Sequence, residues 1–200
     1  MCNQRRVTPN DVALAKNNWE DWGNVFNHAG AMVDNPLLAD QAVFNNFLAE
    51  YSVGRTIRAR TRDNLRATLS SANLQLAKRL ADAKGMGIDA LDVTLSKDYA
   101  AGYRLRSAIS KIAAFLVPEY FIAWDHYASR GIKIETGRLL GHSYETYAEY
   151  LADVNALLAM MHNGIAHACQ GNYPQDLVEI NRFHRRVLDV YLMRIGGRQY

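Results

Sequence analysis

The sequence contains few cysteines and prolines and no long apolar run. Its two cysteines, Cys2 and Cys169, are too few to staple a small secreted domain or to hold a four-thiolate metal centre. No stretch approaches the roughly 18 consecutive apolar residues of a membrane-spanning helix. Residues 1–6 are basic, but no apolar segment follows them as it does in a signal peptide. We therefore expect a cytoplasmic protein with no membrane association, no metal and no cofactor.

The composition is typical of an ordinary globular domain. Hydrophobic residues make up 49% of the 200 residues and charged residues 22%, which excludes a disordered chain. The formal net charge of +3 does not by itself identify a nucleic-acid-binding protein, so the local distribution of charge has to decide. Neither an internal repeat nor a Gly/Ser-rich linker divides the chain. One domain over residues 1–200 is expected, monomeric by default.

Apolar periodicity predicts an all-α fold of about seven helices. Thr8 and Pro9 are typical of a helix start, and Gly85 is expected to end a long third helix. The stretch 88–103 follows no clear period, and Ile132 and Ile134 are expected in a loop or a short strand. The first predicted helix begins at Pro9. The other six are predicted over residues 36–51, 57–84, 107–117, 124–129, 143–168 and 174–195.

The third predicted helix carries a concentration of arginines. Residues 55–66 hold five arginines against one aspartate, and four of them recur at steps of three, four and four: Arg55, Arg58, Arg62 and Arg66. This spacing places them along one side of the helix. Because the guanidinium fork fits phosphate oxygens, the stripe is a candidate DNA-backbone contact. The alternative is a solvated face whose arginines pair with acids elsewhere.

The common catalytic and metal-binding motifs are absent. The sequence contains no phosphate-binding glycine loop, no G-x-S-x-G and no H-E-x-x-H. His162 and His167 are five residues apart, which places them about 140° from each other around a helix. We expect them to be ordinary packing or surface histidines, and a zinc site that also uses Cys169 is the less favoured alternative.

One segment carries a pattern of its own. Lys111 lies on the helix that ends before Pro118, and Asp125 follows the lysine by fourteen residues. Alone, these residues are typical of a solvated lysine and a helix cap. The full pattern over residues 107–128, S-x-x-S-K-x-x-x-F-x-x-P-x-x-F-x-x-x-D-x-x-A, resembles the core of the helix-hairpin-helix DNA glycosylase superfamily. It is most similar to bacterial proteins with the 8-oxoguanine DNA glycosylase (OGG) fold, and the ending R-x-x-D-x-Y-L-x-x-x-G over residues 186–196 is similar to the close of that group.

The resemblance implies a single all-helical, bilobal, glycosylase-like domain in which Lys111 is the nucleophile and Asp125 the catalytic aspartate. In the family, a glycine-bearing hairpin before the lysine helix holds the DNA phosphate. The equivalent stretch 102–106 has one glycine, so the hairpin is degenerate and Arg104 and Arg106 are candidates to bind phosphate instead. The candidates for base stacking are Trp124, His126 and Tyr127.

The implied chemistry sets a condition on the lysine. A glycosylase extrudes the damaged nucleotide and attacks its sugar, while a carboxylate stabilises the cationic character of that sugar. Only a neutral amine can form the Schiff base, yet a lysine in water is almost entirely protonated near neutral pH. Lys111 therefore needs a desolvated place or a neighbouring cation. Around its predicted helix, Lys111 lies about 120° from the centre of the apolar face, at the edge of the apolar stripe.

Three functions remain open at the level of the sequence. The first is a lysine-dependent DNA glycosylase/lyase acting on an oxidised or otherwise damaged base in double-stranded DNA. The second is a non-catalytic nucleic-acid-binding or defence-associated protein on the same fold, with salt-sensitive DNA binding. The third is a helical interaction protein with no role on nucleic acid. The placement of Lys111 and Asp125 relative to each other distinguishes the first from the others.

Overall fold

The computed structural model describes residues 6–26, 34–51, 57, 59–70, 85–98, 105–141, 143–171 and 180–199. Within these ranges the chain is helical and contains no strand, which confirms the all-α prediction. The same ranges hold ten α-helices and one 3-10 helix rather than about seven helices. None of the described helices combines the length and the apolar character needed to cross a membrane.

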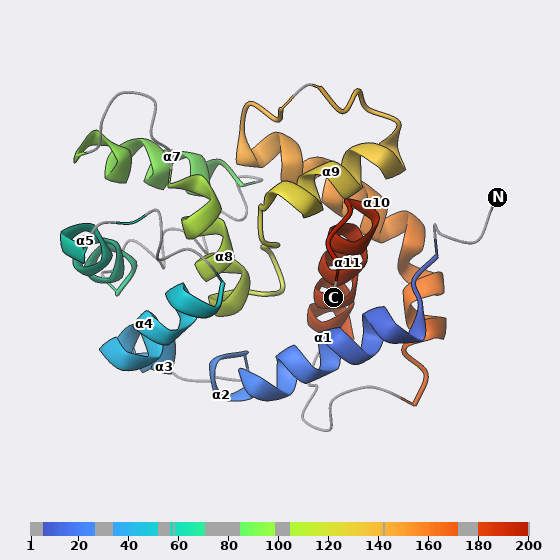
Figure 1. Cartoon of the computed structure of the whole chain (residues 1–200), viewed down its shortest axis with the longest axis horizontal. Coiled ribbons are helices and arrows are strands. Elements are labelled where there is room, and N and C mark those ends of the chain that lie inside the picture. The colour runs from blue at the N-terminus through green and yellow to red at the C-terminus, as the bar shows by residue number, and fades with distance from the viewer. Residues whose placement is uncertain are drawn as a thin grey trace.

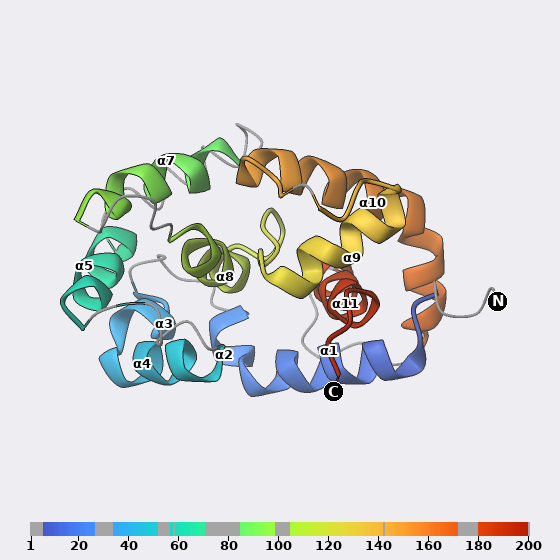
Figure 2. The same cartoon turned by 45° about the horizontal axis from the view of Figure 1, so that its top comes forward.

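Three helices occupy the middle of the molecule and the others surround them (Figures 1 and 2). The central helices are α8 (Arg106–Leu116), α9 (His126–Thr136) and α11 (Ile180–Ile195). The surrounding elements are α1 (Pro9–Asp21), α2 (Gly23–Phe26), α3 (Pro36–Ala39), α4 (Gln41–Glu50), α5 (Ala59–Ser70), α7 (Met86–Leu95), the 3-10 helix η2 (Ser96–Asp98) and α10 (Tyr147–Ala168). Helix α11 packs against α9, α1 and α10, so the last helix joins the two ends of the chain.

Side-chain caps fix where the main helices begin. Thr8 accepts a hydrogen bond from the backbone N–H of Asp11, and the Asp11 carboxylate accepts one from the N–H of Thr8. This reciprocal pair confirms the predicted first helix. Asp125 caps α9, because its Oδ1 accepts from the N–H of Ala128 at 2.8 Å. Helix α10 begins after Thr146 rather than at the predicted Ser143, since the Thr146 side chain is the one that accepts from the first turn.

Two stretches that lacked a clear pattern are helical. Helix α9 continues to Thr136, so the expectation of a loop or strand around Ile132 and Ile134 was wrong. Burial of Ile132 in the core outweighs the strand preference of a β-branched residue. Residues 86–95 form α7, and Gly85, with φ 86°, is the residue at which this helix begins. The predicted third helix after Ser70 and the predicted start of the last helix lie outside the described residues.

Two glycines allow α9 and α11 to approach each other until their backbones touch. A Cβ atom at Gly131 of α9 would overlap the carbonyl oxygen of Leu192. A Cβ at Gly196, just after α11, would overlap the carbonyl oxygen of Tyr127. Only glycine leaves room for backbone at this separation. The two contacts lie about one helical turn apart along each helix, so together they fix the register of α11 along α9.

We predict that Gly131→Ala lowers the free energy of unfolding by about 3 kcal/mol or more, because neither backbone can move without displacing a whole helix. The matched control is Gly164→Ala in α10, where an added Cβ meets nothing within 4 Å. This control should gain up to about 1 kcal/mol from helix propensity. Urea denaturation followed by circular dichroism measures both. Equal stability of the two variants would contradict the close contact.

Candidate active site

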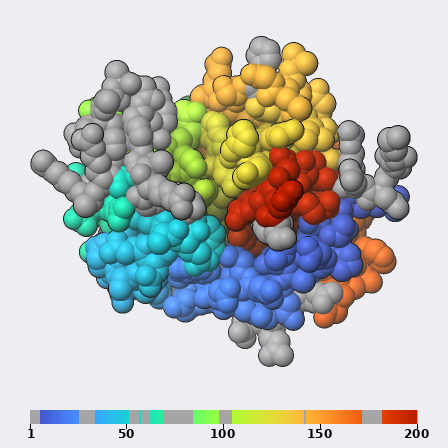
Figure 3. Space-filling model, viewed as in Figure 1, coloured from blue at the N-terminus to red at the C-terminus, as the bar shows by residue number. Residues whose placement is uncertain are grey.

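A cavity of about 860 Å³ lies between α1 and α4 on one side and α8, the start of α9 and α11 on the other. Figure 3 shows the surface of this part of the molecule, with the red C-terminal segment beside the yellow α9 and above the blue α1. Residues from both ends of the chain contribute to the lining. The volume falls within the range of about 300–1,000 Å³ that is usual for small-molecule sites.

Lys111 and Asp125 line this same cavity. The half-buried Lys111 extends from α8, and its Nζ donates a hydrogen bond to the backbone carbonyl of Tyr51 at 3.3 Å, at the end of α4. Asp125 reaches the cavity from the N-terminus of α9, where one of its two carboxylate oxygens forms the cap. The two residues that the resemblance singled out are therefore brought together, and a ligand in the cavity could contact both.

Sequence reasoning missed a second carboxylate, Asp189 of α11. Asp189 is 2% exposed and lines the cavity with Lys111 and Asp125. Its Oδ2 accepts a hydrogen bond from Nη1 of Arg186 at 2.5 Å, whereas its Oδ1 has no hydrogen-bond partner in the part of the chain that the structure describes. Such a half-satisfied buried carboxylate is uncommon and points to a site.

Burial raises the pKa of Asp189 to about 6, against an ordinary value of 3.8. The cation of Arg186 opposes this effect, and the nearby charge of Asp125 adds to it. The positive charges of Lys111 and Arg198 lower the pKa of Asp189 more weakly. Asp189 therefore interacts electrostatically with both residues of the predicted catalytic pair.

The signal that could have identified Asp189 was present in the sequence. Arg186 and Asp189 are three residues apart in the last helix, within the R-x-x-D-x-Y-L-x-x-x-G ending, and the residues around them are apolar. This spacing on an otherwise buried face predicts a buried ion pair. The Arg186 guanidinium also lies 5.4 Å from the centre of the Phe115 ring of α8.

The opposite wall of the cavity is formed by α1 and the end of α4. The Tyr51 hydroxyl lies there and accepts a hydrogen bond from the Asn18 side-chain amide. Burial raises the pKa of Tyr51 to about 12, so its hydroxyl stays neutral at physiological pH. Asp21 and Glu50 add two carboxylates to this wall. The wall offers neutral and acidic hydrogen-bonding groups rather than a positive surface.

The three candidates for base stacking separate into two groups. His126 and Tyr127 are exposed, line the cavity and contact each other edge to face, with ring centres 5.5 Å apart. Trp124 is absent from the lining. It stacks on Tyr150 with ring centres 5.5 Å apart, and the Arg106 guanidinium covers it at 4.9 Å. Trp124 is therefore part of the packing between α8, α9 and α10.

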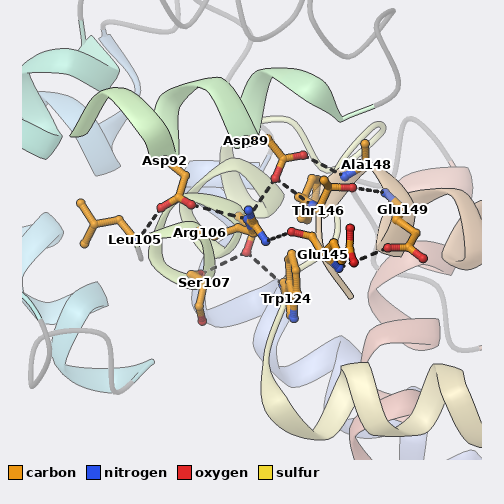
Figure 4. A network of polar contacts seen from close by, with 12 residues as sticks. Asp89, Asp92, Leu105, Arg106, Ser107, Trp124, Glu145, Thr146, Ala148 and Glu149 are labelled. Atoms are coloured by element: carbon orange, nitrogen blue, oxygen red, sulfur yellow. Dashed lines mark hydrogen bonds and ion pairs between the residues drawn. The ribbon is translucent and has the colours of Figure 1, made fainter. Parts of the chain in front are cut away.

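Arg106 holds parts of the protein together, contrary to the predicted phosphate contact. Its Nε forms ion pairs with Asp89 at 2.9 Å and with Asp92 at 3.6 Å, and its Nη1 donates to the carbonyl of Glu145 at 2.7 Å (Figure 4). Asp92 is fully buried and also accepts from the N–H of Leu105 at 2.6 Å. These contacts join α7, α8 and the segment before α10. They leave the guanidinium poorly placed to bind DNA.

The described members of the arginine stripe also bind the protein itself. Arg62 donates from Nε to the carbonyl of Ile57 at 3.2 Å. Arg66 donates from Nη1 to the carbonyl of Leu38 at 2.8 Å, which ties α5 to α3. Neither lines the cavity. The other three candidate phosphate ligands, Arg55, Arg58 and Arg104, lie outside the described residues.

Comparison of the chain with family models, with curated proteins and with solved structures finds no match. Among the described residues, no cluster of three or more His, Cys, Asp or Glu side chains could hold a metal ion. The charged side chains that α8, the start of α9 and α11 contribute to the cavity are Lys111, Asp125, Arg186 and Asp189.

We predict that Arg106→Ala destabilises the protein by about 3 kcal/mol, because it leaves the buried Asp92 carboxylate without its cation. The matched control is Arg138→Ala. Arg138 pairs with Glu149 and Asp153, but its side chain is 45% exposed, so solvent screens the pair and the loss of stability should be much smaller. Urea denaturation of the two variants checks the ranking, and a reversed order would refute the role assigned to Arg106.

The raised pKa of Asp189 also predicts a pH dependence of stability. Between about pH 4 and pH 6 the folded protein holds a proton on Asp189 that the unfolded chain has released. Protonation therefore favours the folded state at the lower pH, and this contribution is lost as the pH rises through 6. Relative to Asp189→Asn, the wild type should lose stability on the order of 3 kcal/mol over this window, since each pKa unit corresponds to about 1.4 kcal/mol.

Urea denaturation of wild type and Asp189→Asn at both ends of the window measures this difference. Taking the difference removes the contribution of His184, because both proteins contain that residue. Burial lowers the pKa of His184 to about 4, so its protonation acts in the opposite direction. A stability difference that is independent of pH would show that Asp189 titrates at its ordinary value.

Proposed function

We propose that the protein is a DNA N-glycosylase with lyase activity that removes an oxidised or otherwise damaged base from double-stranded DNA, with Lys111 as the nucleophile. One observation carries the proposal. Lys111 and Asp125, fourteen residues apart in the sequence, line one cavity of about 860 Å³. That volume is large enough for a single nucleotide turned out of the duplex.

In the proposed reaction the Lys111 amine attacks C1′ of the extruded nucleotide while the bond from C1′ to the base breaks. The electron pair of that bond leaves with the base, and the sugar acquires cationic character. The Asp125 carboxylate stabilises this charge from the N-terminus of α9. Opening of the sugar ring then moves a proton from the amine nitrogen to the ring oxygen and leaves a Schiff base between Lys111 and C1′.

The charges of the cavity support an extruded nucleoside rather than a phosphate as its occupant. Among the described residues of its lining, four are carboxylates, Asp21, Glu50, Asp125 and Asp189, and three are cations, Lys111, Arg186 and Arg198. A neutral base and sugar fit this near balance, whereas a phosphate would meet the repulsion of the acids. Arg198 belongs to the C-terminal segment and is exposed, so it is a candidate to contact the DNA backbone outside the cavity.

Two aromatic side chains support recognition of a base. His126 and Tyr127 line the cavity directly after Asp125 in the chain and expose their rings. A base stacked on either ring would hold its sugar close to the carboxylate that stabilises it. We therefore assign base stacking to His126 and Tyr127. Trp124 is packed between Tyr150 and Arg106 instead.

A non-catalytic DNA-binding protein on the same fold receives less support. That alternative depended on the arginine stripe, and its described members Arg62 and Arg66 donate to backbone carbonyls of the protein itself. It also gives no reason for a lysine and a second, buried carboxylate to share a cavity with Asp125.

We predict that borohydride traps a covalent complex between the protein and a DNA duplex containing one abasic site. Borohydride reduces the Schiff base, so the complex survives denaturing electrophoresis. Lys111→Gln should abolish it, because no amine then reaches C1′. Lys97→Gln is the matched control, since Lys97 is exposed on η2 and lies outside the cavity.

The control variant should form the complex at the wild-type rate. Wild-type trapping that persists unchanged in Lys111→Gln would assign the reaction to another amine and end the proposal. The same assay with duplexes that carry single oxidised or alkylated bases then identifies which base is released.

A further inference from the structure

Asp189 occupies a position for which the reaction above has no role. Its carboxylate is buried, faces the cavity that holds Lys111 and Asp125, and has one oxygen bonded to Arg186 and the other without a hydrogen-bond partner within the described ranges. A lysine nucleophile must lose a proton before it attacks, and that proton needs an acceptor inside the cavity. The second oxygen of Asp189 is available for this purpose.

We propose that Asp189 is the proton acceptor of the site: it takes the proton that Lys111 releases before attack and returns it to the leaving group. The inference rests on the proposed function and assigns its acid–base residue. The two carboxylates then have separate roles, since Asp125 stabilises the cationic sugar and Asp189 carries the proton.

The step balances in protons and electrons. The Lys111 ammonium transfers one proton to Asp189, and the amine lone pair forms the bond to C1′. The group that leaves C1′ takes the electron pair of the broken bond and recovers the proton from Asp189. In a damaged nucleotide this group is the base. At an abasic site it is the hydroxyl of the carbinolamine, which departs as water. Asp189 ends the step ionised, as it began.

Asp125 is less suited to carry the proton. Its Oδ1 accepts the cap hydrogen bond from Ala128 at 2.8 Å, so this carboxylate also holds the start of α9 in place. Within the described ranges, the Asp189 carboxylate bonds to Arg186 of its own helix and to no helix terminus. Of the two carboxylates, Asp189 is the more deeply buried, and a buried carboxyl group is the better proton carrier near neutral pH. The pKa of about 6 for Asp189 agrees with this assignment.

Charged and titratable groups from each neighbouring element act on Asp189. Arg186 on its own helix and Arg198 beyond it favour the ionised form, as does Lys111 of α8. Asp125 at the start of α9 favours the protonated form.

Tyr147 and Tyr150 of α10 also interact with Asp189, and they remain neutral because burial raises the pKa of both hydroxyls. Arg182 and Arg185 lie with Asp189 around a small adjoining pocket. Asp189 thus lies between opposing charges that leave it able to gain or lose a proton.

The test is the pH dependence of complex formation on the abasic-site duplex, measured in single turnovers with borohydride. In the wild type the rate should rise with pH, with a midpoint near 6, as Asp189 ionises. Asp189→Asn should be slower by about 100-fold near neutral pH and should lack this rise. Asp189→Glu keeps a carboxyl group and should retain the rise. Asp63→Asn, an exposed acid outside the cavity, should behave as the wild type.

A second measurement does not depend on activity. Carbon-13 NMR of the aspartate carboxyls follows the titration of Asp189 directly, with Asp189→Asn identifying its signal. Replacing Lys111 by glutamine removes a cation that lowers the pKa of Asp189, so the midpoint should move to higher pH. An unchanged midpoint would show that the two groups do not interact and would overturn the assignment.

The remaining outcomes separate the two proposals. A wild-type protein that traps DNA together with an Asp189→Asn variant of the same rate and pH profile would overturn the role of Asp189 and leave the glycosylase proposal standing. Absence of trapping by the wild type would overturn both. Urea denaturation of each variant confirms that the slower rate belongs to a folded protein.

Discussion

The direct backbone contact between α9 and α11 is the constraint on which the candidate site depends. At Gly131 against Leu192 and at Gly196 against Tyr127, the backbones of the two segments meet with no side chain between them. Asp125 precedes α9 and Asp189 lies one turn before Leu192 on α11, so this contact sets the separation of the two carboxylates. The third residue of the site, Lys111, lies on α8. The contacts of Arg106 connect this helix to α7 and to the segment before α10.

The site contains an unfavourable electrostatic arrangement that the stability of the fold does not require. Asp189 is buried beside another carboxylate, and the ion pair with Arg186 satisfies only one of its oxygens. An apolar residue would fill the same space with less loss of stability at neutral pH. Elsewhere the core uses conventional means, such as the aromatic cluster of Trp22, Phe47, Tyr51 and Phe115. A local departure from good packing chemistry is a feature of functional sites.

The sequence predicted what depends on local pattern and missed what depends on contact between distant segments. The all-α class, the cap at Thr8 and the helix around Lys111 follow from periodicity and capping chemistry. The continuation of α9 through Ile132 does not, because it depends on burial against α11. The arginines show the same limit. Arg106 was assigned to phosphate because sequence could not reveal that Asp89 and Asp92 lie across from it. Asp189 shares a cavity with Lys111 and Asp125 only because α8, α9 and α11 come together in the fold, which the sequence does not show.

The aromatic cluster has a practical consequence. Trp22 is almost fully buried, yet its ring lies 6.2 Å from that of Tyr51 and 5.8 Å from that of Phe115, two residues that form the cavity wall. The other two tryptophans, Trp19 and Trp124, are packed away from this lining. Only one layer of side chains therefore separates the Trp22 indole from a ligand in the cavity. The intrinsic fluorescence of Trp22 should consequently change when a ligand binds, with no added label.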